Sequence, residues 1–152
     1  MARYKVIINT DAYKCKTCSK KNWEPGTMND YMISINGITR TLYSMREVMW
    51  QIELFRGNSF LHSEYDDENC GLSDRYENFL KKNTIKYYDR LCGIERTQYL
   101  SGYGWMQGYF DIEEVLKKLK AEGTVRVPFK WLYDIRQYDK AMDGCYMEIV
   151  KC

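Results

Sequence analysis

Thiols and lysines that could do chemistry gather in one stretch near the N-terminus, YKCKTCSKKNW, residues 13–23. Within it, Cys15 and Cys18 have the C-x-x-C spacing found in zinc sites and in redox-active dithiols. A structural zinc site usually has four ligands, but the sequence contains no second C-x-x-C or C-x-x-H pair. The other two ligands would have to come from distant positions, either His62 and Cys70 or members of the set Cys92, Cys145 and Cys152. We therefore expect no cofactor, with zinc at Cys15 and Cys18 as the alternative.

Catalytic signatures are absent from the sequence. Redox work by the C-x-x-C pair would need a helix N-terminus to lower the pKa of the attacking thiol, but the following residues, SKKNWEPG, do not favour a helix. Nucleophilic catalysis by cysteine or serine normally needs a base, and His62 is the only histidine. No Walker, H-E-x-x-H, G-x-S-x-G or kinase motif occurs. We expect a protein that is not an enzyme, with a zinc-stabilised or cysteine-dependent enzyme as an alternative.

The lysines of the same stretch make nucleic acid a candidate partner. Lysines neutralise phosphates, and planar rings stack on unpaired bases. Residues 1–26 contain six basic and two acidic side chains, a local net charge of +4, whereas the whole chain carries only +2. A single-stranded nucleic acid would be bound by Lys14, Lys16, Lys20, Lys21 and Trp23. An ordinary solvated loop is the alternative interpretation of these residues.

Aromatic side chains and glycines alternate in a second segment, IERTQYLSGYGWMQGYF, residues 94–110, which we expect not to be helical. Tyrosine and tryptophan are enriched at interaction hot spots, and glycines free the backbone around them. The leading hypothesis is therefore a non-enzymatic binding protein that contacts a protein or ribonucleoprotein. Packing of the same rings in the core is the alternative. The predicted partner-binding residues are Tyr99, Tyr103, Trp105 and Tyr109.

Length and composition indicate one folded domain over residues 1–152. A chain of this size buries roughly two-thirds of its unfolded surface around one core. The 45% apolar and 15% aromatic residues exclude a disordered chain. The apolar run near the N-terminus is too short for a signal peptide, and no stretch approaches the roughly 20 apolar residues that span a bilayer. We expect a cytoplasmic protein with reduced thiols and no membrane partner. Its richness in lysine, asparagine, isoleucine and tyrosine is similar to that of small accessory or inhibitor proteins of phages and mobile elements.

The elements that would position these residues begin with a strand at residues 3–9, which is rich in β-branched side chains. Residues 30–43 alternate apolar and polar side chains around Asn36-Gly37, the strongest short-range signal for a β-hairpin. A helix is predicted over residues 44–57, because Ser44 and Glu47 have the capping-box spacing. Its apolar stripe is Met45, Val48, Met49, Ile52 and Phe55.

Two more helices and two strands are predicted in the second half. One helix covers residues 73–93, with a basic face that would assist nucleic-acid binding: Arg75, Lys81, Lys82, Lys86 and Arg90. The other covers residues 111–123, and Asp111 is expected to cap it. Strands follow over residues 124–135 and 145–152, the first at a sheet edge because Pro128 lacks an N–H. The predicted fold class is α+β, a single compact domain with a small, mainly antiparallel sheet packed against about three helices.

Overall fold

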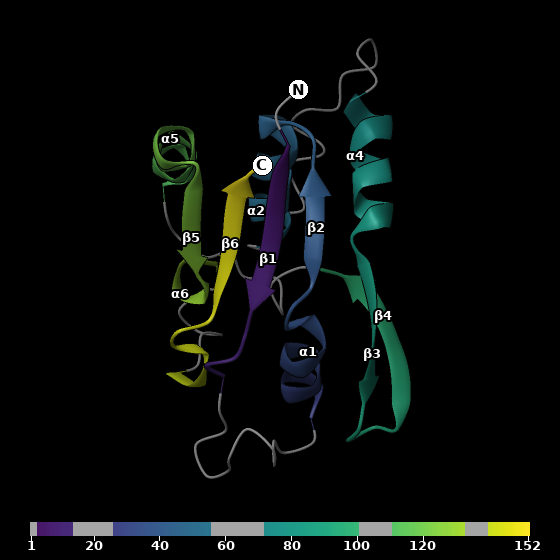
Figure 1. Cartoon of the computed structure of the whole chain (residues 1–152). Helices are drawn as coiled ribbons and strands as arrows, with labels where there is room; N and C mark the ends of the chain where they lie inside the picture. The colour runs from purple at the N-terminus through teal and green to yellow at the C-terminus, as the bar shows by residue number, and fades with distance from the viewer. Residues whose placement is uncertain (1–2, 14–25, 56–71, 101–110, 133–139) are drawn as a thin grey trace.

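Four strands form an antiparallel sheet in the order β2-β1-β6-β5 (Figure 1). The computed structural model describes residues 3–13, 26–55, 72–100, 111–132 and 140–152. Val6 lies opposite Ile149, and Ile149 lies opposite Val125, so the buried positions of neighbouring strands share one face. The strands are β1 (Tyr4–Asn9), β2 (Thr39–Leu42), β5 (Thr124–Pro128) and β6 (Tyr146–Lys151).

Helices and a second, two-stranded sheet complete the described part of the chain (Figure 1). The helices are α1 (Thr27–Ile35), α2 (Met45–Phe55), α4 (Leu72–Lys82), α5 (Ile112–Glu122) and the short α6 (Phe129–Leu132). The second sheet is the antiparallel hairpin of β3 (Thr84–Asp89) and β4 (Ile94–Tyr99). The α+β class, with a mainly antiparallel sheet packed against helices, is confirmed.

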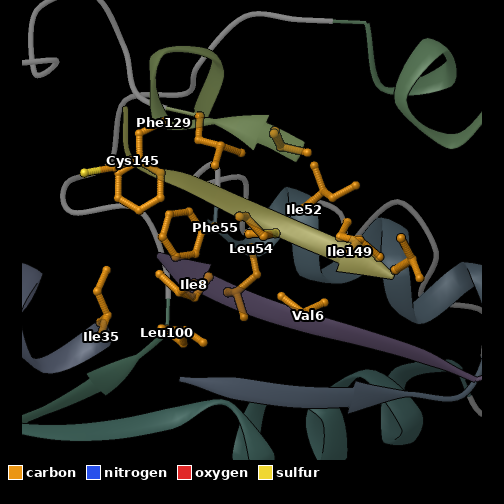
Figure 2. Close-up of a cluster of buried hydrophobic side chains, with 14 of the residues drawn as sticks. Val6, Ile8, Ile35, Ile52, Leu54, Phe55, Leu100, Phe129, Cys145 and Ile149 are labelled. Atoms are coloured by element: carbon orange, nitrogen blue, oxygen red, sulfur yellow. The ribbon is translucent and has the colours of Figure 1, made fainter. Parts of the chain in front are cut away.

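The core joins the main sheet to α2, a helix that begins as its sequence predicts. Ser44 Oγ accepts a hydrogen bond from the Glu47 N–H at 3.1 Å, which satisfies a backbone group of the first turn. At the other end of α2 the ring centroids of Phe55 and Phe129 are 5.2 Å apart. Figure 2 shows this pair in one cluster with Ile8 of β1 and other buried side chains. One apolar core therefore connects α2 with β1, β6 and the start of α6.

The predicted hairpin over residues 30–43 is wrong in its first half, which is helix α1. An alternating strand would bury Ile33, yet Ile33 is 44% exposed. Gly37 has a φ of 83° and follows the helix C-cap Asn36, so the Asn-Gly pair ends a helix instead of turning a hairpin. The apolar run fits both periods, and packing of α1 against β3 selects the helix. Its buried side chains follow the helical period: Tyr31, Met32 and Ile35.

The predicted helix over residues 73–93 is also wrong in its second half, because it ends at Lys82. Asn83 redirects the chain: its side-chain amide donates to the Phe79 carbonyl at 2.8 Å, in competition with helical continuation. From Thr84 the burial period is two, as β-branched and aromatic residues favour. The predicted basic face is thereby divided, with Arg75, Lys81 and Lys82 on α4 and Lys86 and Arg90 on the hairpin.

The two C-terminal strands are present, with one shorter than predicted. The strand predicted over residues 124–135 ends at Pro128, and Phe129–Leu132 forms α6. Strand β5 lies at the edge of the main sheet, as the missing N–H of Pro128 requires. At the start of α5, Asp111 Oδ1 accepts from the Glu113 N–H at 3.0 Å and caps the helix as expected.

Candidate binding surface on the β3–β4 hairpin

Large apolar side chains gather in solvent on the β3–β4 hairpin. Of the seven large hydrophobic side chains that are exposed among the described residues, four belong to it. Their exposed fractions are 58% for Tyr88, 69% for Leu91, 47% for Ile94 and 46% for Tyr99. Leu91 lies in the turn between Tyr88 and Ile94, and we call these three residues the hairpin tip. Ile94 lies opposite Asp89, on the other face of the hairpin from Tyr88, so the three side chains surround the turn. Single exposed apolar residues are ordinary on proteins, whereas three of them at one turn favour an interaction site.

The hairpin has an inner face against α1 and an outer face in solvent. On the inner face, the rings of Tyr87 and Tyr31 pack edge to face with centroids 5.5 Å apart. All residues of the outer face are exposed, so none of the described elements covers it. The outer face consists of three cross-strand pairs: Thr84 with Tyr99, Lys86 with Thr97, and Tyr88 with Glu95.

A buried carboxylate holds the turn of the hairpin in one shape. Asp89 is fully buried, and its Oδ1 accepts hydrogen bonds from the Leu91 N–H at 3.0 Å and the Cys92 N–H at 3.1 Å. Its Oδ2 accepts from Arg96 Nε at 2.9 Å, a bond that raises the pKa of the Arg96 guanidinium. The Asp89 carbonyl accepts from the Gly93 N–H at 2.7 Å. Every one of these bonds restricts the backbone that carries Leu91.

A second buried carboxylate fixes the same turn from α1. Oδ2 of Asp30 accepts a hydrogen bond from the Arg90 N–H at 2.7 Å, and Oδ1 forms an ion pair with Arg90 Nε. Oδ2 also accepts from the Gly26 N–H at 3.3 Å, at the start of α1. One carboxylate thereby connects the first turn of α1 to the hairpin, 60 residues later in the chain.

The opposite end of the hairpin is anchored as well. The Leu100 N–H, directly after β4, donates to the carbonyl of Asn83, directly before β3. The Leu100 side chain is fully buried. In Figure 1 the hairpin extends from this anchor beside α1, and its turn points away from α4. Because both ends are fixed, the hairpin tip is preorganised and loses little conformational entropy on binding.

In the two ion pairs near the hairpin tip, the arginine side chains are partly exposed and the carboxylates are buried. The side chains of Arg90 and Arg96 are 40% and 38% exposed, whereas their carboxylate partners are 3% and 0% exposed. On the outer face, Lys86 adds an exposed ammonium and Glu95 an exposed carboxylate, so the cationic excess comes from the two arginines. A partner surface with an apolar pocket and an acidic rim would complement this arrangement.

Only one of the predicted partner-binding residues lies within the described residues. Tyr99 is about half exposed on the outer face of β4. The other three, Tyr103, Trp105 and Tyr109, lie outside the described residues. The predicted nucleic-acid-binding residues also lie outside them: Lys14, Lys16, Lys20, Lys21 and Trp23.

Sequence reasoning missed the hairpin tip, because the helix predicted over residues 73–93 includes Leu91. The signal that could have identified it is the run DRLCG, where Asp89 and Gly93 are residue types that favour turns. Together with the period-two pattern on its N-terminal side, this run indicates a hairpin.

The predicted zinc ligands Cys15, Cys18, His62 and Cys70 lie outside the described residues. Among the described residues, no three histidine, cysteine or acidic side chains lie close enough together to hold a metal ion. The three cysteines that the structure describes differ in burial: Cys145 is buried, whereas Cys92 and Cys152 are exposed.

Comparisons with protein-family models, with curated proteins and with solved structures give no match to this chain. Within the described part of the chain, the structure contains no helix with the length and apolar character that crossing a membrane requires.

Proposed function

We propose that this protein is a non-enzymatic binding protein that inserts its hairpin tip into an apolar pocket of a partner protein, either free or within a ribonucleoprotein. The observation that supports it is the 69% exposure of Leu91 in a turn fixed by the buried carboxylates of Asp30 and Asp89. A rigid turn that keeps Leu91 in solvent near the exposed ring of Tyr88, a residue type enriched at interaction hot spots, can fill an apolar pocket with little ordering cost.

The expected energetics are those of a small preorganised anchor. Burying one leucine side chain contributes about 1.5–3 kcal/mol. Since the turn is already ordered by hydrogen bonds, little of this is lost to ordering the backbone. The outward cations of Arg90 and Arg96 would speed association with an acidic rim and make it sensitive to salt.

A matched pair of substitutions tests the proposal. Leu91→Asp places a charge at the hairpin tip, and Ile33→Asp places the same charge at an isoleucine that is 44% exposed on α1. Both variants and the wild type are immobilised, candidate partners are identified by quantitative mass spectrometry, and affinities are then measured with purified components. We expect a partner that Ile33→Asp retains and that Leu91→Asp binds at least roughly tenfold more weakly.

Two additional measurements refine the result. Circular dichroism and thermal melting check that all variants fold alike. Tyr99→Ala extends the test to the outer face of β4, the only predicted partner-binding position among the described residues. Equal affinity of every partner for the wild type and Leu91→Asp would contradict the proposal.

A further inference from the structure

A hollow with a volume of about 290 Å³ lies between α2 and α4. It is separate in sequence from the hairpin tip, because the residues that line it belong to the two helices and to Ser44 at the start of α2. Pockets at the lower end of the range for small ligands have about this size. The lining residues on which the inference depends are Arg46, Glu47, Trp50, Arg75, Phe79 and Lys82.

Two aromatic rings form a fixed base for this hollow. Trp50 of α2 and Phe79 of α4 are 4% and 5% exposed, and their ring centroids are 5.6 Å apart. The Tyr76 ring packs edge to face on Trp50, with centroids 5.2 Å apart. Buried rings in mutual contact hold the two helices at one spacing, so the hollow exists without a ligand.

The cations at the hollow are not used for internal contacts. Among the described residues, no hydrogen bond or ion pair involves the side chains of Arg46, Arg75 or Lys82. The arginines that do pair have clear carboxylate partners, as Arg126 has in Glu148 at 3.0 Å. Three cations that line one hollow, without partners among the described residues, are an arrangement that an anionic ligand would complete.

The single acidic residue of the lining offsets only one of these three charges. Glu47 lies at the hollow, but its Oε2 accepts a hydrogen bond from the Tyr43 N–H at 3.3 Å, in the capping arrangement of α2. Three cations and one carboxylate give the lining a formal net charge of +2. This value matches a phosphate monoester, which carries about −1.5 to −2 at neutral pH, better than it matches a single carboxylate.

We infer that the hollow between α2 and α4 binds the phosphate group of a small organic phosphate. The guanidinium groups of Arg46 and Arg75 have the fork geometry that bonds two phosphate oxygens, and Lys82 adds a point charge. The hydroxyl of Ser44 and the amide of Asn78, both in the lining, supply further donors. This site is independent of the hairpin tip and of the function proposed for it.

Isothermal titration calorimetry of the full chain with AMP, adenosine and inorganic phosphate tests the inference. We expect saturable binding of AMP, weaker binding of inorganic phosphate and no binding of adenosine. Added salt should lower the affinity for both AMP and phosphate. Arg75→Gln and Lys82→Gln should each weaken AMP binding roughly ten- to hundredfold, as the loss of a hydrogen bond to a charged group predicts. Lys117→Gln, an equal loss of charge at an exposed position of α5, should leave it unchanged.

Two results would overturn the inference. They are the absence of saturable AMP and phosphate binding, and equal weakening of AMP binding by Arg75→Gln and Lys117→Gln. The Leu91→Asp variant should bind AMP like the wild type, so failure of this site and failure of the hairpin tip are distinguishable.

Discussion

Asp30 of α1 accepts a hydrogen bond from the Arg90 backbone N–H and pairs with the Arg90 side chain in the turn of the β3–β4 hairpin. The Asp30 side chain is only 3% exposed, so solvent water has little access to its two contacts with Arg90. Helix α1 and the hairpin therefore behave as one unit, and the position of Leu91 depends on a residue in another element.

Loss of this carboxylate should loosen the hairpin. We expect Asp30→Ala to lower the free energy of unfolding by about 1.5–3 kcal/mol, because hydrogen bonds to a charged acceptor are lost. Amide hydrogen exchange should accelerate at Leu91 and Cys92 more than in the main sheet. Urea denaturation measures the first effect and NMR the second. Glu95→Ala, at an exposed hairpin position, is the control that should change stability by less than about 0.5 kcal/mol.

A buried amide in α2 should be replaceable with a gain in stability. Gln51 is fully buried. Among the described residues, neither its Nε2 nor its Oε1 has a hydrogen-bond partner. Methionine has a similar length and no amide to desolvate, so Gln51→Met should raise the free energy of unfolding by about 1–2 kcal/mol. Thermal and urea unfolding measure the change. Asn83→Ala should act in the opposite direction, since Asn83 donates to the Phe79 carbonyl, and a stability loss in Gln51→Met would contradict the prediction.

Two glycines with positive φ differ in the space around them. Gly123 has a φ of 76° and open space where a Cβ would lie, whereas Gly144 has a φ of 90° and would place its Cβ 2.8 Å from that of Ala12. Gly123→Ala should cost about 1–2 kcal/mol from backbone strain alone. Gly144→Ala should cost a further 1–3 kcal/mol or so from the clash. Adding Ala12→Gly should recover only that second part, and an equal cost for both single variants would contradict the prediction.

The raised pKa of Tyr76 should make the stability of the protein fall at alkaline pH. Burial raises its pKa above the ordinary 10.0, and the charge of Glu53 and the neighbouring Tyr99 act in the same direction. The folded protein therefore retains a proton that the unfolded chain loses, so stability is full below about pH 10 and declines as pH rises toward the folded pKa. Tyr76→Phe should show a smaller decline in urea midpoint over this range than the wild type. Parallel curves for the two proteins would contradict the assignment.

Local signals in the sequence predicted the elements that depend on local physics. The Ser44–Glu47 spacing located the start of α2, and Asp111 located the start of α5, because a cap acts within one turn. The β-branched runs that form β1 and β6 were also identified, since burial of one face leaves a period-two pattern.

Elements decided by distant contacts were not predictable in the same way. The run around Ile33 fits both a strand and a helix, and the helix observed there packs against β3, a partner distant in the chain. Likewise, the residues near Leu91 in the sequence do not indicate that Asp30 accepts a hydrogen bond from the turn that carries Leu91. Tyr99 stays a predicted partner-binding residue and lies on the same hairpin, whereas the hairpin tip was not predicted because its turn depends partly on Asp30, 60 residues earlier in the chain.

The central pair of the main sheet joins β1 and β6, the first and the last of the described strands, since Tyr4 lies opposite Lys151. On a ribosome, β1 emerges long before its partner β6 has been synthesised. During that interval β2 is the only described strand with which β1 can pair, and the edge of β1 that later meets β6 lacks its native partner. Such non-local pairing slows folding and leaves nascent chains open to chaperone binding or aggregation. The sheet therefore closes only after β6 has been synthesised, and nascent chains that stop before β6 should not reach the native state.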